Sequence, residues 1–225
     1  MDRPVVYFPL TMLIMLLFFI MLLPLAMIVF VGVVGRAFLR VGLTPGETFF
    51  LLMMSLLGSA VNIPIAEKVT YEVVSPEENP FLLIMNFPPI RIEKRIILAV
   101  NLGGAVIPTL ISAYLLWKVG PQPGILISIA AVTAISYAFS RPVRGVGITM
   151  PFFVTPLAAT FFSLVFAHTI AGICAYVSGT LGALIGADLL RLKDLEKIGS
   201  GMVSIGGAGV FDGIFLSGVL AVLLS

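Results

Sequence analysis

The long apolar runs constrain this chain more than any other feature of its sequence. The run from Tyr7 to Val34 is almost wholly apolar and is longer than the roughly 20 residues that a helix needs to cross a bilayer. Apolar residues make up 60% of the 225 residues, and only 11% are charged, whereas a soluble domain typically carries about 25%. The sequence therefore predicts a multi-pass integral membrane protein of the cell membrane, surrounded by the lipid bilayer.

Further apolar runs predict an all-α membrane helix bundle, a single transmembrane domain over residues 1–225. One helix begins at Thr44-Pro45-Gly46-Glu47, where Thr and Glu form a capping box and proline occupies the first helical position. The run 148–190 is too long for one span, so we expect either two helices that meet near residues 168–172 or one broken segment. We predict six or seven spans in all. The other apolar runs cover residues 96–117, 125–139 and 203–225.

Residues 67–95 form the only long polar segment. Residues 69–74 alternate in the manner of a strand, a turn cluster follows at 75–80, and residues 91–94 can form a returning strand. We predict a hairpin or flap over 67–95 that rests on the membrane surface.

Several functional classes receive no support. The net charge is only +2 and no basic block is present, so nucleic-acid binding is not expected. His168 is the only histidine, and no cysteine or acid lies at metal-ligand spacing from it. We therefore predict no metal and no cofactor. The sequence leaves the oligomeric state open.

Asp188 and Asp212 are the acids that best fit a functional role, because both lie in apolar surroundings. In antiparallel helices they would lie at the same end of the bundle. Gly182 and Gly186 form one small-xxx-small pair, and Gly209 and Gly213, on either side of Asp212, form a second. Such pairs would let the two helices approach closely. Two neighbouring carboxyl groups tend to share one proton, which suits both aspartic proteolysis and proton-coupled transport.

A structural explanation competes with the functional one. Asp188 can face interfacial water and pair with Arg191, and Asp212 can cap a helix. Asn62 and Asn101 can bond backbone groups freed near Pro64 and near Gly103-Gly104, or they can contact a ligand. The predicted catalytic residues are Asp188 and Asp212, and the predicted substrate-binding residues are Gly207, Gly209, Phe211, Gly213, Asn62 and Asn101.

The segment GVFDGIFLS at residues 209–217 resembles the signature of the presenilin-like, GxGD-type intramembrane aspartyl proteases. Gly209 matches the first glycine and Asp212 the catalytic aspartate, while Phe211 stands where the family has its second glycine. The resemblance implies that Asp188, on the preceding helix, is the other catalytic aspartate. The family's later Pro-Ala-Leu element has no counterpart after Asp212. The whole chain also resembles an uncharacterised prokaryotic family of multi-spanning membrane proteins, which implies no activity.

Three functional hypotheses follow. The first is an intramembrane aspartyl protease-like enzyme that acts on membrane proteins or peptides through Asp188 and Asp212. The second is a small proton-coupled transporter or channel with these acids on its path. The third is an assembly subunit in which the small-residue faces bind partners.

Overall fold

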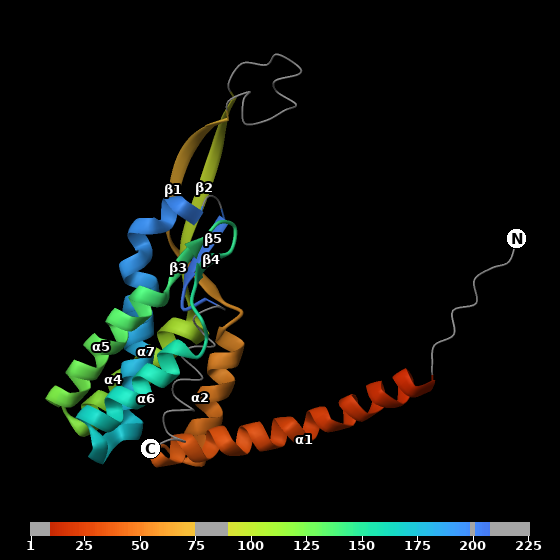
Figure 1. The fold of residues 1–225 in the computed structure, drawn as a ribbon, viewed down its shortest axis with the longest axis vertical. Coiled ribbons are helices and arrows are strands. Elements are labelled where there is room, and N and C mark those ends of the chain that lie inside the picture. The colour runs from red at the N-terminus through yellow and green to blue at the C-terminus, as the bar shows by residue number, and fades with distance from the viewer. Residues whose placement is uncertain (1–9, 75–89, 199–200, 208–225) are drawn as a thin grey trace, which may run out of the picture.

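The fold combines a helical bundle with a β-sheet, as seen in a computed structural model that describes residues 10–74, 90–198 and 201–207. The described chain is mainly helical (Figure 1), but its strands correct the all-α prediction. The α-helices are α1 (Leu10–Arg40), α2 (Pro45–Gly58), α4 (Ile107–Val119), α5 (Pro123–Phe139), α6 (Val154–Phe166) and α7 (Ala171–Ala183).

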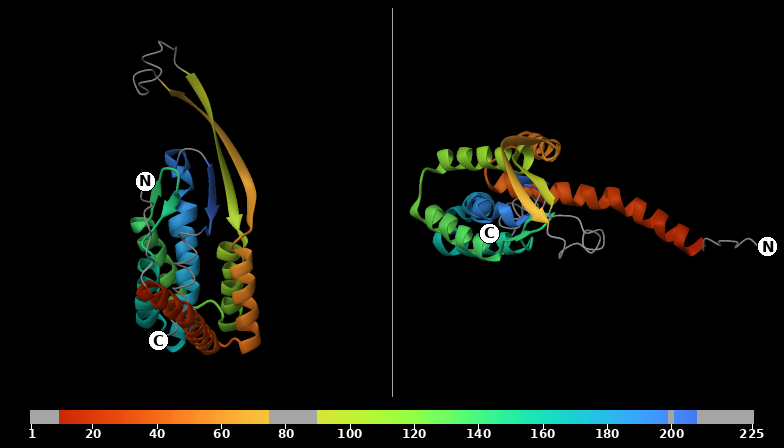
Figure 2. Two further views of the ribbon diagram at one scale, coloured as in Figure 1. Left: turned by 90° about the vertical axis from the view of Figure 1, so that its right-hand side faces the viewer. Right: turned by 90° about the horizontal axis from the view of Figure 1, so that it is seen from above.

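Helix α1 extends away from the base of the bundle (Figures 1 and 2). Its apolar side chains are exposed around the helix, including Phe18 at 60% and Met21 at 79%. Its last turns pack on the bundle, where Phe38 is buried. A helix that is apolar on all sides is stable where lipid or protein covers it.

Helix α2 begins where the capping box predicts. The backbone N–H of Thr44 donates to Glu47 Oε2 at 2.7 Å, and the N–H of Glu47 donates to Thr44 Oγ1 at 3.3 Å. The helix ends at Gly58, because the chain turns there into the first strand.

The predicted polar hairpin is confirmed in the described residues and is longer than expected. Strand β1 (Asn62–Val74) pairs antiparallel with β2 (Ile90–Asn101), and the two extend beyond the bundle (Figures 1 and 2). The prediction of a span from residue 96 is wrong for residues 96–101, which belong to β2. The helix starts only after them, as the π-helical turn η2 (Leu102–Val106) that continues into α4.

A third strand completes this sheet. Strand β5 (Gly201–Ile205) pairs in parallel with β2, which gives the order β1-β2-β5. The prediction of a helical span from residue 203 is therefore wrong for residues 203–205. The apolar run does not reveal this pairing, because a short apolar segment fits a buried strand as well as a helix.

The long run 148–190 forms two helices with a bend, as predicted. The 3₁₀ turn η3 (His168–Ile170) joins α6 to α7, and a small hairpin of β3 (Arg141–Val143) and β4 (Gly147–Thr149) precedes them. Helix α7 continues through the π-helical turn η4 (Leu184–Asp188) into the 3₁₀ segment η5 (Leu189–Ile198).

Gly182, near the end of α7, and Gly186, in η4, both pack closely against α5. A Cβ on Gly182 would lie 2.7 Å from Cγ1 of Val132, and one on Gly186 would lie 2.3 Å from the carbonyl oxygen of Thr133. These two glycines therefore approach α5 closely, and the predicted approach to the helix that contains Asp212 falls on residues outside the described part of the chain.

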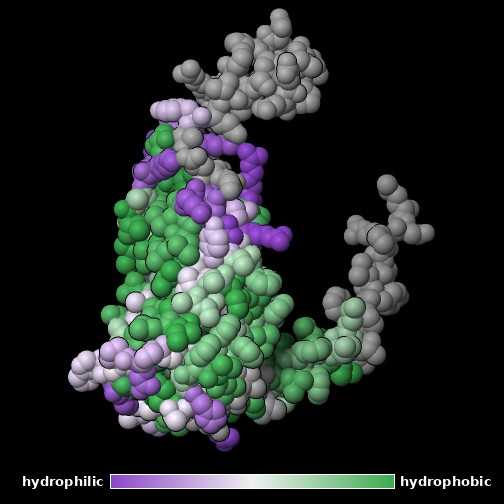
Figure 3. Space-filling view, turned by 60° about the vertical axis from the view of Figure 1, so that its left-hand side comes forward, coloured by the Kyte–Doolittle hydropathy of each residue, from purple (hydrophilic) through white to green (hydrophobic). Residues whose placement is uncertain are grey.

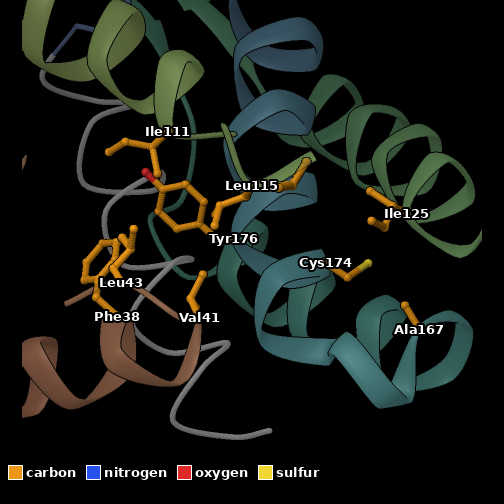
Figure 4. Packing of buried hydrophobic residues seen from close by; sticks show 10 residues of the cluster. Phe38, Val41, Leu43, Ile111, Leu115, Ile125, Ala167, Cys174 and Tyr176 are labelled. Atoms are coloured by element: carbon orange, nitrogen blue, oxygen red, sulfur yellow. The ribbon is translucent and has the colours of Figure 1, made fainter. Parts of the chain in front are cut away.

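The largest apolar core joins the end of α1 to α4 and α7 (Figure 4). Tyr176 on α7 packs edge-on against Phe38, with ring centroids 5.6 Å apart. Leu115 of α4 is fully buried in the same cluster. This core ties the base of the bundle together and leaves the opposite end of α7, where Asp188 lies, to pack on the sheet.

Two helical segments among the described residues are long and apolar enough to cross a membrane. They cover Leu102–Val119 and His168–Leu195. Six or seven full-length spans are not found in the described part of the chain, because some apolar runs form strands and others form shorter helices. In the view of Figure 3, apolar residues cover much of the bundle surface, and polar residues gather both toward the hairpin and at the opposite end of the bundle.

Candidate functional site

Asp188 lies at the point where the helical bundle meets the sheet. It is the last residue of η4, and only 2% of it is exposed. Its Oδ2 accepts a hydrogen bond from the backbone N–H of Gly206 at 2.7 Å. This bond joins the end of the α7 helix to the turn after β5. Because burial of an unpartnered carboxyl group is costly, the bond also stabilises the position of Asp188.

Glycine is required at Gly206. Its φ of +72° is in the left-handed region, and a Cβ there would lie 2.6 Å from the backbone nitrogen of Ala105. Gly104, the residue before Ala105 in η2, is equally close to this turn, since a Cβ on Gly104 would lie 2.0 Å from the carbonyl oxygen of Gly206. These two glycines therefore let the turn after β5 lie directly against η2.

Asn101 anchors η2 to the neighbouring elements. It ends β2, is 4% exposed, and its Oδ1 accepts a hydrogen bond from the N–H of Gly104 at 2.7 Å. Its Nδ2 donates to the carbonyl oxygen of Ser59 at 2.7 Å and to Oδ1 of Asn62 at 3.1 Å. The prediction that the asparagines bond freed backbone near the glycines is confirmed for Asn101.

Ser204 extends this network to the third strand, because its hydroxyl donates to Oδ1 of Asn62 at 2.5 Å. The side chains of β1, β2 and β5 are thus connected below the hairpin. We call the following connected residues the polar junction: Asn62, Asn101, Gly104, Asp188, Ser204 and Gly206.

Two π-helical turns meet at the polar junction. Asp188 ends η4, and Gly104 lies within η2. Such turns are rare and occur frequently at functional sites, because the extra residue re-aims the groups around it. Both contact the Gly206 turn, η4 through the Asp188 hydrogen bond and η2 through the close approach of Gly104. We infer that the polar junction is the part of the described chain most specifically shaped for a function.

The structure brings together four of the predicted site residues. Asp188, Asn62 and Asn101 belong to the polar junction, and Gly207 lies beside it, donating its N–H to the carbonyl oxygen of Ser204 at 3.0 Å. The pairing of Asp188 with Asp212 stays a prediction. The remaining predicted residues lie outside the described part of the chain: Gly209, Phe211, Asp212 and Gly213.

The alternative pairing of Asp188 with Arg191 is wrong. Arg191 turns toward the end of α5, where its Nη2 donates to the carbonyl oxygens of Tyr137 and Ser140, both at 2.7 Å. Its Nη1 lies 3.2 Å from Oδ2 of Asp194. The free carbonyls at the end of a helix attract a cation, and this attraction explains the direction that Arg191 takes.

Sequence reasoning missed three members of the polar junction. Gly104 and Gly206 belong to the doublets Gly103-Gly104 and Gly206-Gly207, and paired glycines are the sequence signal for a close approach of backbones. Ser204 carried no signal, because an isolated serine in an apolar run is common.

The described residues hold no group of three or more His, Cys, Asp or Glu side chains that could bind a metal ion. His168 is exposed in η3.

Residues 56–224 match a protein family described as "Protein of unknown function (DUF1614)". This chain belongs to the DUF1614 family. The matched range contains the hairpin, both π-helical turns and every residue of the polar junction, whereas α1 and most of α2 precede it. Comparisons of this DUF1614 chain with curated proteins and with solved structures found no match.

Proposed function

We propose that this protein is an intramembrane aspartyl protease-like enzyme that hydrolyses peptide bonds of membrane proteins with Asp188 and Asp212. The observation that carries the proposal is the hydrogen bond between the buried Asp188 and the N–H of Gly206, which precedes the GVFDGIF segment in the chain. One proposed catalytic carboxyl group is thereby tethered to the segment that contains the other.

The length of the tether limits the separation of the two acids. Asp212 follows Gly206 by only six residues, and such a stretch spans at most about 20 Å when extended and about 9 Å as a helix. A buried position for Asp188 also suits a dyad, because two close carboxyl groups in apolar surroundings tend to retain one proton between them.

The sheet offers a means of holding an extended substrate. Strand β5 pairs with β2 on one side, and no described strand pairs with its other side. A peptide that added to this edge would gain main-chain hydrogen bonds in an extended conformation beside Asp188. The edge of β1 is less suitable, because Pro64 lacks an N–H and the register shifts between Pro64 and Ala66.

The proposed reaction is acid–base catalysis by the two carboxyl groups. The ionised one takes a proton from water as the water oxygen attacks the peptide carbonyl carbon. The protonated one donates its proton to the carbonyl oxygen. The proton taken from water then passes from the first carboxyl group to the peptide nitrogen, the C–N bond breaks and releases the amine, and a hydroxyl proton of the tetrahedral intermediate returns to the second carboxylate.

The test is cleavage of a panel of labelled single-span membrane peptides by the full-length protein in liposomes, with products identified by mass spectrometry. D188N and D212N are each expected to lower the cleavage rate by about 10²–10⁴-fold, the usual effect of removing an acid–base group. E93Q is the matched control, because Glu93 is an exposed acid on the hairpin.

Folding of each variant is checked by its melting profile in detergent. Cleavage that persists in folded D188N or D212N would exclude the dyad, as would the absence of cleavage by the parent protein across the panel.

We also propose that the bundle lies across the bilayer as a multi-pass protein with the hairpin outside it. The exposed apolar surface of α1 supports this arrangement, as does the length of α5, whose 17 residues extend about 26 Å against a hydrocarbon core of about 30 Å. In a C174A background, Y71C in the hairpin is expected to react with a membrane-impermeant maleimide, and F161C in the bundle is not. Equal labelling of the two positions would contradict this placement.

A proton-coupled transporter is the second candidate, favoured by the hydrogen-bonded side chains that connect Asn62, Asn101 and Ser204 near the buried Asp188. Its distinguishing result is substrate-driven proton uptake into proteoliposomes that D188N abolishes, with no peptide cleaved by the parent protein.

A further inference from the structure

A cavity lies at the end of α5, and its lining shares no residue with the polar junction. It has a volume of about 390 Å³ and lies between the last turn of α5, the small β3–β4 hairpin and the segment that leads into α6. Its lining residues are Ala138, Phe139, Arg141, Thr149, Met150 and Pro151.

Arg141 is the only charged residue in this lining. Within the described chain, no ion pair or hydrogen bond of its guanidinium group is found, and its backbone carbonyl accepts a bond from Thr149 Oγ1 at 3.4 Å. The nearby carbonyls of Tyr137 and Ser140 are already bonded by Arg191. The positive charge of Arg141 is therefore available to an occupant of the cavity.

Three exposed aromatic rings lie on or beside the cavity. Phe139 is 53% exposed, and beside the cavity the paired rings of Phe152 and Phe153 are 58% and 51% exposed. These residues lie where α5 ends and α6 is about to begin, toward the end of the bundle from which the hairpin extends (Figure 1). Aromatic rings beside a cation are typical of the boundary between hydrocarbon and headgroups.

We propose that this cavity binds the headgroup of an anionic phospholipid. The guanidinium group of Arg141 donates to the phosphate oxygens, a geometry for which its planar fork is suited. The acyl chains lie along the exposed rings of Phe139, Phe152 and Phe153. Charge complementarity selects an anionic lipid over a zwitterionic one, because the lining supplies a positive charge and no acidic side chain to bind an amine.

The experiment uses the full-length protein with a single tryptophan reporter. W117F removes the only native tryptophan, and F152W places a reporter beside the cavity without altering its lining. The variant is reconstituted into phosphatidylcholine vesicles that contain a minor fraction of brominated phosphatidylglycerol, or the same fraction of brominated phosphatidylcholine. Quenching of the fluorescence measures the association of each brominated lipid with this end of α5.

Brominated phosphatidylglycerol is expected to associate about fivefold more strongly than brominated phosphatidylcholine, the preference that one cationic side chain typically gives toward anionic lipid. R141Q is expected to remove the preference and R141K to retain part of it. R95Q is the matched control and should leave the preference unchanged, because Arg95 lies on the hairpin and pairs with Glu67 and Glu93.

Three results would overturn the proposal. They are equal quenching by the two lipids, a preference that survives R141Q, and a preference that inorganic phosphate removes at constant ionic strength. The last result would identify a site for free phosphate rather than for lipid.

Discussion

Gly206→Ala is the substitution that tests the architecture of the polar junction most directly. The new methyl group meets two separate obstacles. The backbone at Gly206 has a φ of +72°, which side chains other than glycine rarely adopt, and the Cβ would lie 2.6 Å from the backbone nitrogen of Ala105. The two nearest atoms, the nitrogen of Ala105 and the carbonyl carbon of Gly104, both belong to the backbone. A change of side-chain rotamer therefore cannot relieve the contact.

The expected cost follows from these two contributions. A left-handed conformation costs a non-glycine residue about 1–2 kcal/mol, and overpacking costs about 1–3 kcal/mol. Together they predict a loss of about 2–5 kcal/mol in the free energy of unfolding. In a protein of this size, about 2–4 °C of melting temperature is lost per kcal/mol, so the melting temperature should fall by roughly 4–20 °C.

Two further variants separate the contributions, with melting temperatures measured for the full-length protein in detergent. Gly145 has a φ of +74°, close to that of Gly206, and no atom within 4 Å of its Cβ position, so G145A carries the conformational cost alone. G104A carries the steric cost without a left-handed backbone, because its Cβ would lie 2.0 Å from the carbonyl oxygen of Gly206. G206A should be clearly more destabilising than G145A.

The reasoning would be refuted if G206A and G145A lowered the melting temperature equally, or if G104A had no effect. Either result would mean that η2 and the turn after β5 do not lie in contact. G206A is also expected to impair any activity that depends on Asp188. A displaced turn would move the N–H of residue 206, which donates a hydrogen bond to the carboxyl group of Asp188.

Two other substitutions test the supports of the site. Arg191→Met removes three hydrogen bonds to the end of α5 and the salt bridge to the buried Asp194. We expect the free energy of unfolding to fall by about 3–5 kcal/mol, measured as a lower melting temperature, and R191K to have a smaller effect. An unchanged melting temperature would contradict this role. Asn101→Ala removes three hydrogen bonds and should lower the free energy of unfolding by about 2–4 kcal/mol. N62A, at an exposed position, should lower it less, and a larger effect of N62A would argue against Asn101 as the anchor.

Parts of the fold were predictable because their signals are local. The capping box formed by Thr44 and Glu47 predicts the start of α2, because its four residues contain the N-cap and the first turn. The strand alternation and turn residues between 67 and 95 predict the hairpin, and the bend near His168 follows from a run too long for one helix. Asp188 and Asn101 could be singled out because polar groups in apolar runs require a partner.

The sequence by itself determined that this chain is apolar, mainly helical and interrupted by one polar hairpin, since composition and periodicity act over neighbouring residues. Only the tertiary structure decided that residues 96–101 and 201–205 pair as strands, because their partners lie far away in the sequence. It also directed Gly182 and Gly186 to α5, and Arg191 to the carbonyls of Tyr137 and Ser140. Each of these outcomes depends on which backbone or side chain comes within reach after folding, which no local pattern encodes.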